Sequence, residues 1–396
     1  MDNVIEMQSE KAAHVGYKHT EIGIIPEDWE VNPLEEYTMF VGSGKTNTKS
    51  KGTFPLFGST GQIGSCSNPE YDGDAILIAR VGANAGKLSF VSGQYGVSDN
   101  TIIVKLKPQN NIHFFKYWLT YQNLNSLVFG SGQPLITGTQ LKELLLPAPS
   151  INEQTAIANV LSDTDALLTR LEQLIAKKQA IKTATMQQLL TGRTRLPQFA
   201  KHSDGTLKGH RPSELGAIPE DWQVVPFKDV LTIKHGKNQK EVESPSGQYP
   251  IYATGGQIGN ATSFLFDKPS VLIGRKGTID KPRYAETPFW TVDTLFYSEI
   301  KKDFCVKFVY YKFCMIDWMQ YNEASGVPSL NAHTIENVLV TLPNLEEQTA
   351  IASILSDMDD ELKAFEQKLA KIRDLKQGMM QQLLTGRIRL PLDQQP

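Results

Sequence analysis

The chain contains one sequence pattern twice, with the two copies 193 to 195 residues apart. TEIGIIPEDWEV at 20–31 returns as SELGAIPEDWQV at 213–224, and GSTGQIG at 58–64 returns as ATGGQIG at 253–259. MQQLLTGR at 186–193 recurs unchanged at 380–387. A repeat of this length predicts two copies of one fold, and duplicated copies usually pack about a pseudo-two-fold axis.

The first part of each copy has the pattern of a mixed α/β domain. Apolar runs such as DAILIAR at 74–80 and TIIVKL at 101–106 are bounded by Gly, Asn and Pro, which is typical of strands. An aromatic stretch with helical spacing follows, HFFKYWLTYQNLNSLVF in one copy and VKFVYYKFCMIDWMQYN in the other. Such aromatics could stack on bases, but helical spacing favours the core, and we assign them no binding role.

Each copy ends in a stretch with the heptad pattern of a coiled coil. In the second copy, apolar residues recur every seven positions from Ile351 to Met379, followed four residues later by Leu355, Leu362 and Leu369. The first copy is weaker, because Thr164 and Lys178 occupy seam positions where they could fix the register. A helix of ~38 residues is about 57 Å long, which indicates a spacer. The seam closes only if the two helices run antiparallel.

Both helical stretches have signals for their ends. Ser150 with Glu153, and Asn344 with Glu347, have the spacing of a capping box after a proline. The C-terminal signals are Gly192 and Gly386. RTRLPQFAKHSDGTLKGHR at 193–211 is rich in charge and turn formers, which predicts a linker that is either a solvated loop or a phosphate contact.

Composition limits the function classes. With 40 Lys plus Arg against 43 Asp plus Glu, the net charge is -3, so any nucleic-acid surface must come from local patches. The three cysteines form no C-x-x-C pair, which argues against a zinc site or a disulfide framework. The first twenty residues have no apolar signal-peptide core and no stretch has the length of a membrane span, so we expect a soluble, cytoplasmic protein.

Catalytic motifs are incomplete. FVGSG at 40–44 matches a short methyltransferase cofactor pattern, but no strand-loop-helix context and no N-P-P-Y or D-P-P-Y partner accompany it. GSGKT at 42–46 resembles the end of a P-loop, yet Met39 stands where the first glycine is required. We therefore expect a binding function.

The candidate DNA-binding residues gather in loops that occur at matching places in both copies. GSGKTNTKSKG and IKHGKNQK carry lysines and polar donors suited to phosphates. The LIAR and LIGR runs end in an arginine that could contact guanine or form an intradomain ion pair, and the GQIG loops offer a glutamine that could contact adenine or stabilise a turn. The first-copy candidates are Lys45, Thr46, Lys49, Lys51, Gln62, Arg80, Asn84 and Lys87. The second-copy candidates are His235, Lys237, Asn238, Lys240, Gln257, Arg275, Lys276 and Arg283.

These motifs resemble those of the specificity subunits of type I restriction-modification systems. The resemblance rests on I-P-E-D-W, G-x-x-G-x-I-G, the S-G-x-P strings at 131–134 and 325–328, the helix starts after L-P, and L-L-T-G-R, and it covers nearly the whole chain. It implies two target recognition domains that each read half of a split DNA site. The expected parts are an arm at 1–19, recognition domains at 20–149 and 213–343, long helices at 150–192 and 344–387, a linker at 193–212 and a tail at 388–396.

The resemblance also implies partners and the division of chemistry among them. Two methyltransferase (modification) subunits would dock on the helices, and restriction (endonuclease and translocase) subunits would join through them. S-adenosylmethionine, ATP and magnesium would then bind the partners, leaving this chain non-catalytic and without a cofactor or metal. The seam residues assigned to partner binding are Leu161, Leu168, Ile175, Leu355, Leu362 and Leu369.

Two other functions remain open on the residues alone. The chain could be a non-catalytic adaptor with two binding domains on a coiled-coil rod. It could also be a fused DNA methyltransferase or nuclease. The loops VGANAGKL and KGTIDKPR differ while the framework repeats, so we expect an asymmetric target with two different half-sites.

Overall fold

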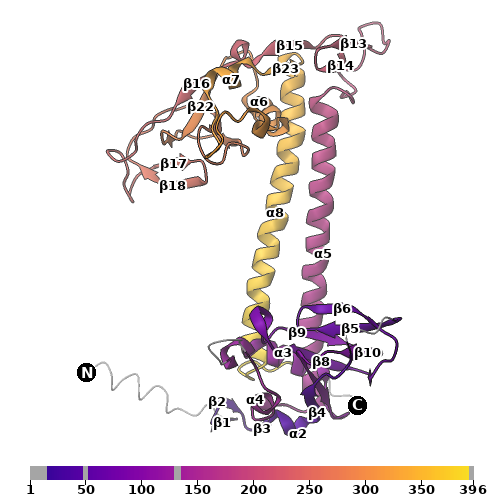
Figure 1. Cartoon of the computed structure of the whole chain (residues 1–396). Coiled ribbons are helices and arrows are strands. Elements are labelled where there is room, and N and C mark those ends of the chain that lie inside the picture. Colours follow the sequence, from indigo (N-terminus) through magenta and orange to yellow (C-terminus); the bar gives the residue numbers. More distant parts are fainter. Residues whose placement is uncertain (1–15, 48–51, 129–134, 392–396) are drawn as a thin grey trace, which may run out of the picture. The chain divides into compact units, whose positions relative to one another are not determined.

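A computed structural model describes residues 16–47, 52–128 and 135–391 (Figure 1). The chain divides into two compact units, Met1–Glu172 with Lys368–Pro396, and Gln173–Gln367. Each unit therefore contains one globular domain and a part of both long helices. The long helices are α5 (Ile151–Leu190) and α8 (Leu345–Leu383), within four residues of the ends that the sequence predicts.

Two sheets form the body of the first globular domain. One is fully antiparallel, in the order β4 (Thr38–Ser43), β11 (Thr101–Leu106), β8 (Ala75–Ala79) and β9 (Leu88–Val91). The other has the order β6 (Gly61–Cys66), β5 (Phe54–Gly58), β10 (Gln94–Val97) and β7 (Tyr71–Asp72), with β5 and β10 parallel. All five residues of β8 are buried, as expected for an apolar strand covered on both faces.

The second domain repeats this topology. Its antiparallel sheet has the order β16 (Leu231–His235), β22 (Leu295–Ile300), β19 (Ser270–Gly274) and β20 (Arg283–Ala285). Its second sheet has the order β18 (Gly256–Ala261), β17 (Tyr249–Ala253) and β21 (Trp290–Thr291), again with one parallel pair. The predicted mixed α/β tandem repeat is confirmed.

Shorter elements connect the sheets to the long helices. In the first unit these are β1 (Tyr17–Thr20), β2 (Gly23–Pro26), β3 (Glu30–Pro33), β12 (Leu145–Ala148), α2 (Leu34–Tyr37), η1 (Gly82–Asn84), α3 (Ile112–Tyr121), η2 (Leu124–Leu127) and α4 (Gly138–Lys142). In the second they are β13 (His210–Ser213), β14 (Gly216–Pro219), β15 (Gln223–Pro226), β23 (Leu339–Leu342), η3 (Phe227–Asp229), α6 (Val306–Met315), η4 (Trp318–Tyr321) and α7 (Ala332–Asn337). The aromatic helices α3 and α6 bury most of their rings, as predicted.

The long helices run antiparallel within each unit. In the first unit, Asp165 of α5 pairs with Lys376 of α8 at 2.6 Å, and Glu172 pairs with Arg373 at 2.6 Å. Partners further along α5 therefore lie earlier in α8. In the second unit, Lys178 reaches Glu361 at 2.7 Å, which is the register contact expected of a polar seam residue.

The seam leucines do not form an accessible partner surface. Leu161 and Leu355 have no exposed area and belong to the cores of the two domains, and Leu362 and Leu369 are also buried. Leu168 and Ile175 are half-buried. Assigning these six residues to partner binding is therefore wrong for the four buried ones, because heptad leucines pack within the chain here.

A tryptophan, a glutamate, an arginine and an aspartate join each globular domain to both long helices. We call Asp28, Trp29, Glu153 and Arg389 the Trp29 cluster. The Trp29 indole donates to Glu153 Oε2 at 3.1 Å, and Arg389 donates to both oxygens of Glu153, at 2.5 and 2.7 Å. Arg389 also holds Asp28 with two bonds of 2.8 and 2.9 Å. The domain, the start of α5 and the segment after α8 thus meet at one carboxylate.

The second unit has the same arrangement, which we call the Trp222 cluster. Trp222 donates to Glu347 at 3.2 Å, and Arg195 binds Glu347 at 2.6 and 2.7 Å. Arg195 further contacts Asp221 at 2.8 Å. The Arg195 side chain is only 8% exposed. The prediction that 193–212 is a solvated or phosphate-binding linker is therefore wrong for Arg195, which binds carboxylates of its own unit.

Only one of the two hydrogen bonds of the predicted capping boxes is present at each helix start, because the glutamate carboxylates are engaged in the clusters. Ser150 and Asn344 accept the backbone N–H of Glu153 and Glu347, at 3.4 and 2.9 Å, as N-cap residues do. The two glutamate carboxylates bind tryptophan and arginine in the clusters.

The glycines that follow the long helices pack against the I-P-E-D-W motif of each domain. Gly192 and Gly386 both have φ of +71°, the left-handed conformation that favours glycine. A Cβ on Gly386 would lie 2.4 Å from Pro26, and one on Gly192 would lie 2.4 Å from Pro219. The repeated T-G-R and I-P-E-D-W motifs therefore recur because they contact each other.

We predict that Gly386→Ala and Gly192→Ala each lower the free energy of unfolding by about 1–3 kcal/mol, since alanine meets both backbone strain and the proline ring. The matched control is Gly378→Ala, at an exposed position of α8 with open space around it. It should raise stability by roughly 0.5–1 kcal/mol. Urea unfolding followed by circular dichroism distinguishes destabilisation from stabilisation. Equal effects at all three sites would contradict the close packing of Gly386 and Gly192 against the two prolines.

We also predict a pH-dependent contribution from Asp221. Burial raises the pKa of this carboxyl, but hydrogen bonds from Arg195 and Lys208 outweigh burial and lower the pKa to about 2. A lowered folded-state pKa gives stability that is present above the unfolded value of about 3.9 and lost as pH falls toward 2. After allowance for solvent screening, Asp221→Asn should cost about 1 kcal/mol at pH 7.

The measurement is the urea midpoint of wild type and Asp221→Asn at pH 7 and about pH 3. The difference should shrink at the lower pH. The control is Asp267→Asn, at an exposed residue with no salt bridge among the described residues. A difference for Asp221→Asn that stays constant with pH would exclude the carboxylate as its source.

Candidate nucleic-acid interface

The two predicted lysine loops are held in the same way in both domains. The loop after β4 is fixed where Gly44 and Thr46 donate their backbone N–H groups to Thr101 and Val97 at 2.9 Å each. After β16, Gly236 and Lys237 donate to Leu295 and Thr291, at 3.2 and 2.8 Å. Lys45 and Lys237 are exposed beside these anchors. The backbone is therefore ordered while the lysine side chains face solvent.

Glycine is required at both anchors. A Cβ on Gly44 would lie 2.2 Å from the Val97 carbonyl oxygen, and one on Gly236 would lie 2.0 Å from that of Val292. No side chain fits at such distances. The G-K dipeptide of both loops thus combines a structural glycine with an exposed cation.

Several other loop candidates have local partners. Thr46 is buried, donates its hydroxyl to Glu70 at 3.0 Å and accepts the Val97 N–H at 2.9 Å, so its role is structural and its assignment to DNA is corrected. Asn238 accepts the N–H of Lys240 at 3.0 Å in a local turn. His235 is exposed and packs its ring against Phe296. Lys49, Lys51 and the string at 131–134 lie outside the described residues.

Arg80 and Arg275 occupy equivalent positions and have equivalent partners. Arg80 donates to the Asp99 carbonyl oxygen at 3.4 Å and to the Ser43 hydroxyl at 3.3 Å. Arg275 donates to the Asp293 carbonyl oxygen at 3.3 Å. Neither forms a salt bridge among the described residues, so the ion-pair alternative finds no support there. Each guanidinium has five N–H donors, which leaves several for a phosphate or base.

The two glutamines bond within their own hairpins. Gln62 donates to the Gly64 carbonyl oxygen and Gln257 to that of Gly259, each at 3.3 Å. Gln257 also donates to Asn260 at 3.1 Å. Both amide groups are thus engaged locally, which favours the turn-stabilising interpretation over bidentate adenine contact.

The remaining candidates differ between the copies. Asn84 and Lys87 line a cavity of about 420 Å³ with Thr120, Asn123 and Asn125. Lys276 is exposed, whereas Arg283 donates to the Gly255 carbonyl oxygen at 2.9 Å and so holds the β17–β18 turn. The loops that the sequence identifies as divergent therefore also have different surroundings.

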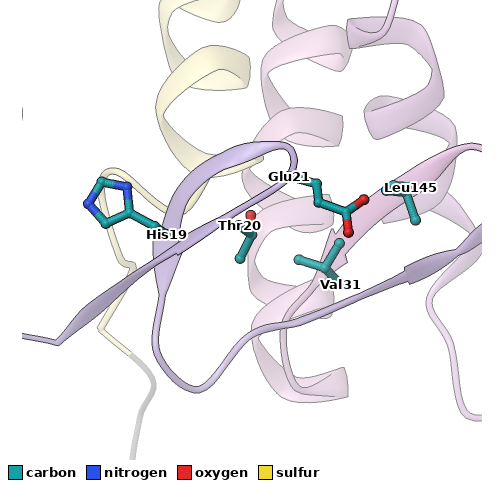
Figure 2. A pocket seen from close by; sticks show the side chains of 5 residues that line it. All are labelled: His19, Thr20, Glu21, Val31 and Leu145. Carbon is teal, nitrogen blue, oxygen red and sulfur yellow. The ribbon is translucent and has the colours of Figure 1, made fainter.

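The cavity beside β1 and the acidic and histidine side chains of the described residues lack the arrangement that a metal site requires. This cavity has a volume of about 490 Å³, and Figure 2 shows His19 and Glu21 at its edge with their polar groups pointing in different directions. Among the described residues, no group of three or more His, Cys, Asp or Glu could hold a metal ion. None of the helices in the described part of the chain is long and apolar enough to cross a bilayer.

The profile of the type I restriction-modification DNA specificity domain matches this chain twice, at 26–183 and 219–374. The chain belongs to this family. It is 25% identical to the type I restriction enzyme MjaVIII specificity subunit of Methanocaldococcus jannaschii, with 92% of this chain and 94% of that protein aligned. It is 23% identical to the Escherichia coli EcoDI specificity subunit, with 92% and 90% aligned.

The fold is also found among solved specificity subunits. The type I restriction-modification S subunit from M. genitalium superposes with a TM-score of 0.66 at 20% identity, covering 90% of this chain and 96% of that one. This likeness supports the two-domain fold. The type I specificity family predicted from the repeated motifs is confirmed.

Sequence reasoning missed a second polar cluster that binds the aromatic helices to the long ones. In the first unit, Tyr117 donates to Asp165 at 2.7 Å, and Lys376 pairs with the same carboxylate. Burial is the largest cause that raises the Tyr117 pKa to about 12, which keeps the hydroxyl protonated as a donor. In the second unit, Tyr311 donates to Asp359 at 2.7 Å and Lys182 pairs with Asp359. The sequence does hold a signal for this cluster, because a Tyr, an Asp and a Lys recur at matching positions of the two repeats.

We predict that Lys45→Ala and Lys237→Ala each weaken the binding of this chain to duplex DNA. Each variant should lower the slope of log K against log salt by about one, because one phosphate contact is lost. Lys302→Ala, an exposed lysine at the start of the loop before α6, is the control and should leave the slope unchanged. Equal slopes for all variants, measured by fluorescence anisotropy, would remove these loops from the interface.

Proposed function

We propose that this chain binds a bipartite, asymmetric DNA target, with one half-site contacted by each globular domain. The observation that supports this best is the pair of glycine-anchored loops that present Lys45 and Lys237 from equivalent positions. Lysines on a fixed backbone suit phosphate contacts, which set register without reading sequence. The different loops beside them, VGANAGKL and KGTIDKPR, would then read different bases.

The long helices are proposed to set the distance between the half-sites. α5 has 40 residues, and a helix of that length extends about 60 Å. One turn of DNA is about 34 Å, so such a spacer leaves base pairs between the half-sites that neither domain reads. The ion pairs along α5 and α8 in each unit support a fixed helix register.

The outer faces of the helices are the proposed docking surface for two modification subunits, and the restriction subunits would join through them. Ile181 and Leu375 stand at equivalent positions of α5 and α8 and are 43% and 58% exposed. Exposed apolar residues on otherwise polar helices suit a protein partner. They replace the buried seam leucines as candidates.

The chemistry is proposed to reside in the partners. This chain would be a non-catalytic subunit, and S-adenosylmethionine, ATP and magnesium would bind the methyltransferase and restriction subunits. Calorimetry with each of these ligands on the isolated chain tests the assignment. Specific binding of any one would contradict it and favour a fused enzyme.

Methylome sequencing of a host that carries this chain with its modification subunits tests the function. We expect methylation at one split motif whose two halves differ. Methylation at a continuous or palindromic motif would contradict the asymmetric target. A normal assembly without sequence-specific DNA binding would favour an adaptor.

We further predict that one heptad inserted after Glu172 and one before Lys368 lengthen the gap between the half-sites. Seven residues add about 10 Å of helix, which corresponds to about three base pairs. The control is a seven-residue insertion at Gly205, in a turn closed by the Lys201–Leu207 bridge. A methylome with unchanged spacing in the helix variant would contradict the spacer role.

A further inference from the structure

A β-bulge occurs at the same place in both domains and centres on an exposed isoleucine. In the β5–β6 hairpin, Leu56 pairs with Gly64 and Phe57 pairs with Gln62, so Ile63 has no partner across the ladder. In the β17–β18 hairpin, Ile251 pairs with Gly259 and Tyr252 pairs with Gln257, which leaves Ile258 in the same position. A bulge reorients one side chain relative to the regular alternation of a strand.

Both isoleucines face solvent, and each is flanked in the sequence by a glutamine and a glycine. Ile63 is 45% exposed and Ile258 is 51% exposed. β6 and β18 are the terminal strands of their sheets, where exposed apolar groups usually carry a cost through aggregation. An isoleucine occupies this exposed place in both copies, while neighbouring loops differ, which makes it a candidate contact for a partner outside the chain.

The neighbouring residues hold the backbone on which each isoleucine is presented. The Gln62 and Gln257 amides bond to the carbonyl oxygens of Gly64 and Gly259, which closes each bulge. A Cβ on Gly58 would lie 2.9 Å from Ile63 Cδ1, so this glycine leaves room for the Ile63 side chain. In the second domain, Arg283 fastens the turn by its bond to Gly255.

The lysine loops follow strands of the other sheet but are anchored to the sheet that carries the hairpins. Thr46 bonds to Val97 at the end of β10, and β10 pairs with β5. Lys237 bonds to Thr291 of β21, and β21 pairs with β17. In each domain, one sheet thus anchors the loop with the exposed lysine and carries the exposed isoleucine in its terminal strand. A cation and an apolar side chain are what a surface needs to contact both phosphates and base edges. In the second domain, the exposed Glu243 lies beside Gly259 and makes that hairpin more acidic.

We propose that Ile63 and Ile258 each make an apolar contact with a base edge of their respective half-sites, beside the divergent loops. This inference rests on the proposed DNA function. The contact would be with a base edge, such as a thymine methyl group, because phosphates offer nothing to an aliphatic side chain. An uncharged contact changes the ratio of specific to non-specific affinity without changing the salt dependence.

The test uses the full chain assembled with its modification subunits, and Ile63→Ser and Ile258→Ser variants. The probes are a duplex that carries the site found by methylome sequencing and a scrambled duplex of equal length. Each variant should lose about tenfold in affinity for the cognate duplex and nothing for the scrambled one, with an unchanged salt slope. Methylomes should show relaxed sequence at one half-site for Ile63→Ser and at the other for Ile258→Ser.

The matched controls are Ile24→Ser and Leu215→Ser, at apolar residues that are 42% and 48% exposed in β2 and in the β13–β14 turn. Both should retain the specificity ratio, and thermal melting confirms folding of every variant. A wild-type complex that shows no sequence preference would overturn the proposed function itself. A specific wild type with unchanged Ser variants, or variants that lose only assembly with the modification subunits, would overturn this inference alone.

Discussion

One buried carboxylate in each unit joins three parts of the chain that are far apart in sequence. Glu153 lies at the start of α5, and it accepts hydrogen bonds from Trp29 of the globular domain and from Arg389 after α8. Breaking such a buried pair leaves an unpaired charge, which costs about 3–5 kcal/mol, although the intact pair itself adds little net stability. Its main effect is specificity: only one placement of the domain, the helix start and the returning segment satisfies all the donors.

The Trp222 cluster imposes the same condition on the second unit, and the tyrosine–aspartate–lysine contacts extend it along the helices. Tyr117 and Lys376 share Asp165, so the aromatic helix α3, α5 and α8 meet at a second point. Two fixed points on one helix pair determine both the register of the helices and the rotation of the domain against them.

The repeat explains how much of this architecture can be predicted from the sequence. Identity between the copies reveals two domains, and the runs AILIA and TIIVKL become the buried strands β8 and β11. The role of Arg195 could not be predicted, because its carboxylate partner Glu347 is 152 residues away and local composition resembles that of a solvated linker. Lys312 shows the same limit. Helical periodicity places it on the buried face of α6, but it cannot predict that the buried ammonium group donates to the Leu190 carbonyl oxygen at 2.6 Å.

Individual interface residues are harder to predict because small backbone features decide which side chains are exposed. The bulge opposite Leu56 and Phe57 leaves Ile63 without a partner in the ladder, although regular strand pairing would give it one. Thr46 stands next to Lys45 in a polar loop, yet its hydroxyl satisfies a buried N–H. Sequence patterns locate the loop but cannot separate the side chain that holds it from the one that faces solvent.

These constraints separate buried residues that cannot change from exposed residues that can. Gly44 and Gly236 admit no side chain, and Glu153 and Glu347 each satisfy several donors, so substitution there disturbs the framework of its unit. Lys87 and Lys276 face solvent, and the sequences around them differ between the copies. Exposed loops on a fixed framework can vary at little cost in folding stability. The exposed loops of the two domains can therefore diverge in sequence while the helices and clusters that hold the domains remain alike.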